Sequence, residues 1–146
     1  MNHKRPDLQT AVELVEVDAV ARAVRRFGDR YLREVFTEHE ISCCGRRGGP
    51  LSALQLAARF AAKEATLKLL GPAAGRPGWR SVEVVRLPTG ACQLRLRGAA
   101  ARLALQRGLG PFTVSLTSEA GLAAAVVTCG SAPGTEQPRT MRSSDQ

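Results

Sequence analysis

Hydrophobic positions near the start of the chain alternate with the period of a β-strand. Residues 11–17 place Val12 and Leu14 on one face and Val15 and Val17 on the other, so both faces are largely apolar. The second face also holds Glu13. An unpaired carboxylate is costly to bury, so this pattern predicts a strand with a cation or a hydrogen-bond donor close to Glu13.

The next segment has the period of a helix. Asp18 is a suitable N-cap for a helix over residues 19–35. Apolar residues at intervals of three or four predict its buried face: Val20, Val24, Phe27 and Tyr31. Arginines at similar intervals lie on another face: Arg22, Arg25, Arg26, Arg30 and Arg33.

Two further helices are predicted by their caps. Thr37 and Glu40 have the spacing of a capping box and predict a short helix, which the loop of residues 45–50 ends. Ser52 predicts the start of a long helix that reaches Leu70, where a Gly-Pro pair stops it.

The second half of the chain contains short strands joined by short turns. The expected elements are strands at 82–87 and 93–97, a helix at 98–107, and a hairpin of strands at 112–116 and 122–128. Helices and strands do not alternate strictly, so we predict an α+β fold with a mainly antiparallel sheet. We expect a flexible arm at 1–9, one domain at 11–129 and a disordered tail at 130–146.

Composition narrows the class of protein. The chain has 146 residues, 44% of them hydrophobic and 23% charged, which suits one globular domain. No apolar run approaches the roughly 20 residues of a membrane span, and the first ten residues lack the apolar core of a secretory signal. We therefore expect a cytoplasmic protein without a membrane anchor. The four cysteines show no metal-ligand spacing and are expected to be reduced thiols.

The net charge of +8 favours an acidic partner. Nucleic acid, a phosphate-rich small molecule and an acidic protein all meet this description. Aromatic residues make up only 4% of the chain, and it has no zinc-finger or helix-turn-helix pattern, so we do not expect nucleic acid to be the partner.

The long helix contains the residues best suited to chemistry. Glu64 and Lys68 lie four residues apart, and the simplest interpretation is an exposed pair that stabilises the helix. The arginines of the first helix can likewise form an ordinary solvated face. The order of motifs along the whole chain favours more specific roles.

Residues 59–71 read RFAAKEATLKLLG. An acidic strand and the segment Phe36–Glu40 precede this motif, and Trp79 and the segment Val114–Thr117 follow it. From about residue 11 to residue 128 the chain resembles 4′-phosphopantetheinyl transferases of the holo-acyl-carrier-protein synthase type. The resemblance implies that family's α+β fold, with one long central helix, and a homotrimer with active sites between subunits.

The resemblance also implies a reaction. Members of the family transfer 4′-phosphopantetheine from coenzyme A to a serine of an acidic acyl carrier protein, with Mg²⁺ neutralising the diphosphate. By this resemblance, Glu13 and Glu64 bind the metal, and Glu64 and Lys68 are catalytic. Coenzyme A is expected to contact Arg59, Lys63, Lys68, Gly71, Thr117 and Ser118. The carrier protein is expected to contact Arg22, Arg25 and Arg26.

Three positions differ from the family pattern. Glu13 stands where Asp is usual, Ala19 where Arg is usual, and Ser118 where a histidine usually contacts the nucleotide phosphates. Two interpretations therefore stay open. The protein is an active transferase, or it is a divergent homologue that binds carrier proteins or acts on a carrier-bound thioester.

Overall fold

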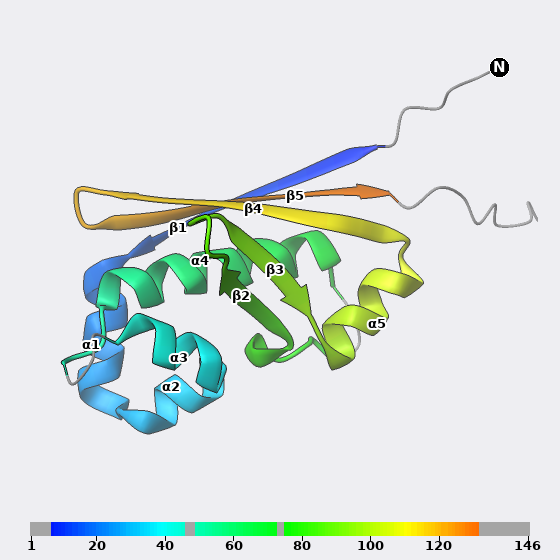
Figure 1. The fold of residues 1–146 in the computed structure, drawn as a ribbon. Coiled ribbons are helices and arrows are strands. Elements are labelled where there is room, and N and C mark those ends of the chain that lie inside the picture. The colour runs from blue at the N-terminus through cyan, green and yellow to red at the C-terminus, as the bar shows by residue number, and fades with distance from the viewer. Residues whose placement is uncertain (1–6, 46–48, 73–74, 132–146) are drawn as a thin grey trace, which may run out of the picture.

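A computed structural model describes residues 7–45, 49–72 and 75–131. Figure 1 shows one layer of strands lying over a layer of helices and a hairpin. The elements in chain order are β1 (Leu8–Glu16), α1 (Val17–Phe27), α2 (Asp29–Val35), α3 (Glu38–Cys44), α4 (Ala53–Leu70), a 3-10 turn η1 (Trp79–Ser81), β2 (Val82–Arg86), β3 (Cys92–Leu96), α5 (Gly98–Gln106), β4 (Leu109–Glu119) and β5 (Leu122–Ser131). None of the helices within these ranges is long and apolar enough to cross a membrane.

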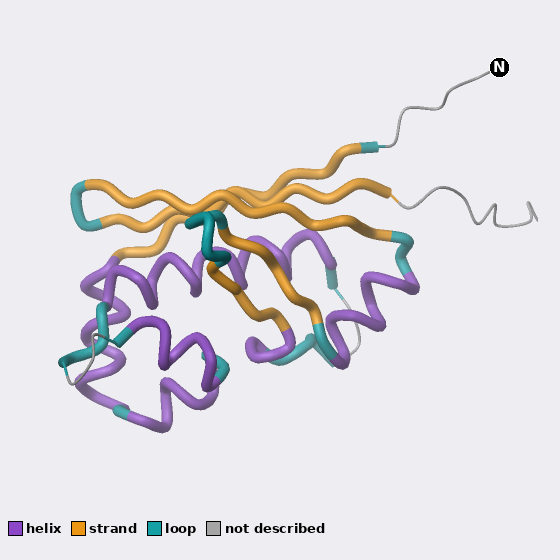
Figure 2. The backbone as a smooth tube through the Cα atoms, viewed as in Figure 1, coloured by secondary structure: helices purple, strands orange, loops and turns teal. Residues whose placement is uncertain are grey.

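The strands form two antiparallel sheets. One sheet has the order β1-β5-β4, and the other is the β2-β3 hairpin. Figure 2 shows the three long strands side by side, with the hairpin crossing beneath them. The predicted α+β class and antiparallel pairing are confirmed, but the strands are divided between two sheets, not gathered in one.

Helix α4 packs against the inner face of the three-stranded sheet and begins and ends where the sequence predicts. The hydroxyl of Ser52 accepts a hydrogen bond from the backbone N–H of Gln55, and Gly71 ends the helix with a φ of 76°. A run of buried alanines lets the helix axis approach the sheet closely: Ala57, Ala61, Ala62 and Ala65. α4 thereby contributes to all three hydrophobic clusters of the core.

The predicted helix over residues 19–35 is two helices. Gly28 adopts a φ of 54°, which favours glycine, and the chain changes direction there between α1 and α2. The predicted buried face is consequently wrong at Phe27, which is 52% exposed, and Leu32 and Val35 of α2 enter the core in its place. Asp18 is also not the N-cap, because α1 already begins at Val17.

The domain limits shift at both ends of the sheet. β1 includes Leu8 and Gln9, which pair with Gly130 and Cys129, because β5 extends to Ser131. The sheet therefore includes two residues of the predicted arm, in β1, and two of the predicted tail, in β5. The rest of both segments, 1–6 and 132–146, lies outside the described residues.

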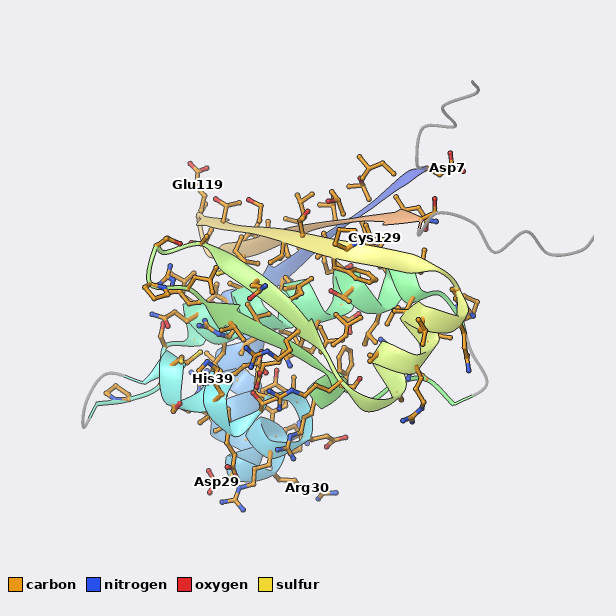
Figure 3. All side chains as sticks on the ribbon, turned by 45° about the vertical axis from the view of Figure 1, so that its right-hand side comes forward. Asp7, Asp29, Arg30, His39, Glu119 and Cys129 are labelled. Atoms are coloured by element: carbon orange, nitrogen blue, oxygen red, sulfur yellow. The ribbon has the colours of Figure 1, made fainter. Side chains whose placement is uncertain are left out.

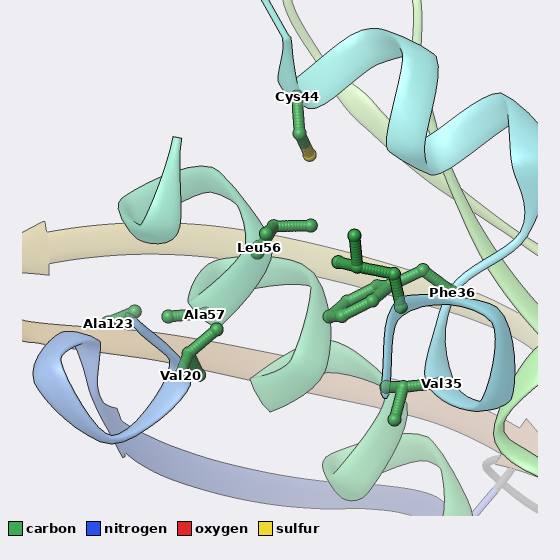
Figure 4. Close-up of a cluster of buried hydrophobic side chains, with 8 residues drawn as sticks. Val20, Val35, Phe36, Cys44, Leu56, Ala57 and Ala123 are labelled. Carbon is green, nitrogen blue, oxygen red and sulfur yellow. The ribbon is translucent and has the colours of Figure 1, made fainter. Parts of the chain in front are cut away.

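The core beside α1–α3 is centred on Phe36, which is fully buried. Figure 4 shows Phe36 pointing toward Leu56 of α4, while Val20 lies close to Ala57 of α4 and Ala123 of β5. This cluster joins the α1–α3 group of helices to both α4 and the sheet.

A buried polar network joins α3, α4 and β2. The ammonium group of Lys63 lies 2.6 Å from Glu40 Oε1, and both side chains are fully buried. Lys63 Nζ also donates to the carbonyl oxygens of Val82 (2.5 Å) and Trp79 (3.1 Å). Glu40 accepts from the backbone N–H groups of Thr37 and Val84. The predicted capping box is confirmed, and its glutamate also holds the buried lysine.

Replacing Lys63 should be costly because it leaves the Glu40 carboxylate buried without its cation. We expect Lys63→Met to lower the free energy of unfolding by about 3–5 kcal/mol. Lys68→Met is the matched control, since the Lys68 side chain is 57% exposed and its loss should cost less than about 1 kcal/mol. Urea denaturation measures both; equal stabilities for the two variants would contradict a structural role for the buried pair.

Candidate active site

Strand β1 and helix α4 bring two carboxylates and a lysine together. Glu13 is on the face of β1 that packs on α4, and its carboxylate forms an ion pair with the ammonium group of Lys68. Lys68 is one helical turn after Glu64, so these two side chains share a face of α4. The simple interpretation of an exposed Glu64–Lys68 pair is therefore wrong: Lys68 reaches across to the strand.

Glu64 has a different cation. Arg76 Nη2, from the segment that follows α4, donates to Glu64 Oε1 at 3.4 Å. Burial raises the pKa of Glu64, and the negative charge of Glu13 raises it further, while Arg76 and Lys68 oppose the shift. Glu13 and Glu64 thus share Lys68 as a neighbouring cation. Glu64 and Lys68 border a groove of about 600 Å³, together with Leu67, Gly71, Pro72, Arg76 and Pro77.

The carboxylates of Glu13 and Glu64 are oxygen ligands of the kind that a hard cation such as Mg²⁺ prefers. Glu13 Oε2 is buried and, among the described residues, has no hydrogen bond, because its contact with Lys68 lacks hydrogen-bond geometry. No group of three His, Cys, Asp or Glu side chains that could hold a metal is found within the described ranges. Mg²⁺ needs no such group, since it commonly takes one or two carboxylates and completes its shell with water and substrate phosphates.

Three more of the residues expected to bind coenzyme A lie in a second groove, of about 560 Å³, between α4, β4 and the β2-β3 hairpin. Arg59, Thr117 and Ser118 line it together with Arg86. Only 5% of Arg59 is exposed. Its Nε atom has no hydrogen-bond partner among the described residues. A buried, incompletely paired guanidinium that borders a groove suits an anion.

Lys63 was expected to contact a nucleotide phosphate, and the structure places it elsewhere. Its ammonium group faces Glu40 and two backbone carbonyl groups in the core. The side chain has no exposed surface. We correct its role to a structural one, because three acceptors inside the protein already occupy the ammonium group.

The arginines expected to bind the carrier protein form one exposed surface. Arg22, Arg25 and Arg26 line a groove of about 570 Å³ on α1, with Ala19, Ala23 and Phe27. The guanidinium of Arg26 lies over the ring of Phe27, 5.2 Å from its centroid. Helix α1 follows β1 directly, so this arginine surface is joined to the strand that holds Glu13.

Two arginines near the C-terminal half of α4 were missed from the sequence. Arg76 lies in a Gly- and Pro-rich segment without periodicity, and only its place just after the long helix could have indicated it. Arg107 follows α5 and donates to the carbonyl oxygens of Leu70 and Pro72, so it holds the C-terminal end of α4. A lone arginine 37 residues from its partner gives no sequence signal.

Comparison with known proteins agrees with this architecture. Residues 10–127 match the model of the 4′-phosphopantetheinyl transferase superfamily. The holo-[acyl-carrier-protein] synthase of Solibacter usitatus is 39% identical over 120 residues, which cover 81% of this chain and 94% of the relative. That of Moorella thermoacetica is 39% identical, covering 82% and 91%. A structure described as the Chronobacterium ammoniagenes ACPS-CoA complex superposes with a TM-score of 0.72 at 26% identity, covering 84% and 96%.

The fold has two antiparallel sheets around α4, and Glu64, Lys68 and Arg76 line one groove beside that helix. The family match covers well over half of the chain. The protein belongs to the 4′-phosphopantetheinyl transferase superfamily.

The pKa of Glu64 reports whether the two carboxylates converge. We expect Glu13→Gln to lower the pKa of Glu64, because a nearby negative charge is removed, and Lys68→Met to raise it, because a positive charge is removed. NMR titration of the ¹³C-labelled Glu64 carboxyl group measures both shifts. An unchanged Glu64 pKa in Glu13→Gln would show that the carboxylates do not share a site.

Proposed function

We propose that this protein transfers 4′-phosphopantetheine from coenzyme A to a serine hydroxyl of an acidic acyl carrier protein. The observation that supports this most is that Glu64 and Lys68 line one groove, while Lys68 also pairs with Glu13 of β1, in a chain of this superfamily. The named activity of the relatives, holo-[acyl-carrier-protein] synthase, supports the same reaction.

In the proposed reaction, the serine oxygen forms a bond to the β-phosphorus of coenzyme A, the one that bears the pantetheine arm. The bond from that phosphorus to the bridging oxygen breaks, and adenosine 3′,5′-bisphosphate leaves. Lys68, with an exposed ammonium group at the groove, binds the phosphate oxygens and stabilises the charge of the leaving group. The Glu64 carboxylate, whose pKa is raised by burial, is suited to accept the serine proton.

Glu13 and Glu64 are the residues that would hold Mg²⁺. The buried Oε2 of Glu13 pairs with the exposed Lys68 side chain but accepts no hydrogen bond among the described residues. This and the raised pKa of Glu64 both favour a cation at these carboxylates. When bound there, Mg²⁺ would neutralise the diphosphate and so lower the repulsion that an oxygen nucleophile meets.

The second groove supports a site shared between copies of the chain. Arg59 and Ser118 line a groove separate from the one at Lys68, and Arg59 and Lys68 are nine residues apart on α4, about 13 Å along the helix. The outer face of the three-stranded sheet leaves Leu8, Val12, Leu14 and Val126 exposed. We propose a homotrimer that covers this face and brings the Arg59 groove of one copy to the Lys68 groove of the next.

A second candidate function rests on Ser118. Its hydroxyl occupies the position on β4 where a histidine is usual, so the Arg59 groove has less positive charge for the nucleotide phosphates. The alternative is a homologue that binds carrier proteins, or acts on a carrier-bound thioester, without transferring phosphopantetheine.

Mass spectrometry separates the two functions. An acidic apo-carrier protein, incubated with this protein, coenzyme A and Mg²⁺, should gain one phosphopantetheinyl group. Glu64→Gln should lower the rate about 100-fold or more, because the proton acceptor is lost. Glu38→Gln, on the exposed surface of α3, is the matched control and should retain the wild-type rate. Carrier binding without any mass gain, across several carrier proteins, would favour the second function.

Carrier-protein docking makes a separate prediction. Arg26→Glu reverses a charge on the exposed arginine surface, so we expect the KM for the carrier protein to rise about tenfold while kcat stays near the wild-type value. Arg102→Glu makes the same change on the exposed side of α5 and should leave KM unchanged. Equal KM values for both variants, measured at low salt, would contradict docking on α1.

A further inference from the structure

Arg76 contacts both Glu64 and the aromatic ring of Trp79. Its Nη2 atom donates to Glu64 Oε1 at 3.4 Å, and its guanidinium carbon lies 4.7 Å from the centroid of the Trp79 ring. Trp79 in turn packs against Phe60 of α4, with ring centroids 5.1 Å apart. The guanidinium therefore rests on an aromatic surface that the core holds in place.

The remaining donors of Arg76 are available to a ligand. A guanidinium has five N–H donors, and the hydrogen bond to Glu64 uses one of them. The side chain is 61% exposed and borders the same groove as Lys68 and Gly71. Stacking on an aromatic ring leaves the edge of the guanidinium free for hydrogen bonds, and this planar edge matches two phosphate oxygens.

The positive charge of Arg76 also allows it to leave Glu64 and bind a phosphate group. In the free protein the Arg76 guanidinium is the cation that neutralises the Glu64 carboxylate, through their contact at 3.4 Å. A cation held by Glu13 and Glu64 would take over that role, and the arginine would then face a groove that holds negative phosphate groups.

We infer that Arg76 is a phosphate-binding residue for the diphosphate of coenzyme A, additional to Lys68. It pairs with Glu64 in the free protein and turns to a phosphate oxygen in the complex. This inference rests on the proposed function, since it assumes coenzyme A in the Glu64 groove.

Calorimetric titration with coenzyme A, in the presence of Mg²⁺, tests the role of Arg76. Arg76→Gln should raise the Kd about tenfold or more, as expected for the loss of a charge-assisted hydrogen bond. The Kd of Arg76→Lys should lie between those of the wild type and Arg76→Gln, because lysine keeps the charge and loses the planar stack on Trp79. Arg102→Gln removes the same charge from the exposed surface of α5, outside both grooves, and should bind like the wild type.

A second ligand separates phosphate binding from a general effect of charge. Adenosine 3′-monophosphate lacks the diphosphate, so its Kd should be equal in the wild type and in Arg76→Gln. An Arg76→Gln variant that unfolds at the wild-type temperature and binds coenzyme A as tightly as the wild type would overturn the role of Arg76. Failure of the wild-type protein itself to bind coenzyme A would instead overturn the proposed function.

Discussion

The position of the candidate active site depends on the buried ion pair between Lys63 and Glu40. Adjacent residues of an α-helix point about 100° apart around its axis, so fixing Lys63 also fixes the direction of Glu64. Lys63 is held on the side of α4 that faces α3 and β2, by one carboxylate and two carbonyl oxygens. Glu64 consequently lies at the boundary of the core, near Glu13 of β1. A buried charge with satisfied partners thus sets the geometry of a neighbouring carboxylate.

The groove combines charges that would repel one another without their partners. Glu13 and Glu64 each have a cationic side chain beside them, Lys68 and Arg76 respectively. In the free protein these pairs neutralise the site. Because both cations are more than half exposed, they can rearrange toward a phosphorylated ligand at small cost.

Much of the fold follows from local signals in the sequence. The Thr37 capping box, the Ser52 cap and the stop at Gly71 are all present as predicted, because each depends on hydrogen bonds within a few residues. The break at Gly28 was missed because the apolar spacing continues across it up to Tyr31. A period shows which residues share a helix face, and it does not show where the backbone turns.

The candidate site could be predicted in part. A carboxylate on an apolar strand predicts a cation close to Glu13, and Lys68 of α4 is that cation. The joint role of Glu13 and Glu64 stays a prediction from the resemblance to a family. Lys63 was misassigned because a lysine in a motif looks the same whether it faces a ligand or the core, and its buried partner Glu40 is 23 residues away in the sequence. Arg76 was missed because its role comes from contacts with Glu64 and Trp79, which only the folded chain brings together.

We propose that Glu13 and Glu64 together hold a cation beside the diphosphate of coenzyme A. Crystals grown with coenzyme A and Mn²⁺, which replaces Mg²⁺ and scatters anomalously, test it most directly. We expect an anomalous peak within coordination distance of both carboxylates and of a phosphate oxygen. A peak that contacts neither Glu13 nor Glu64, with coenzyme A bound elsewhere, would contradict it.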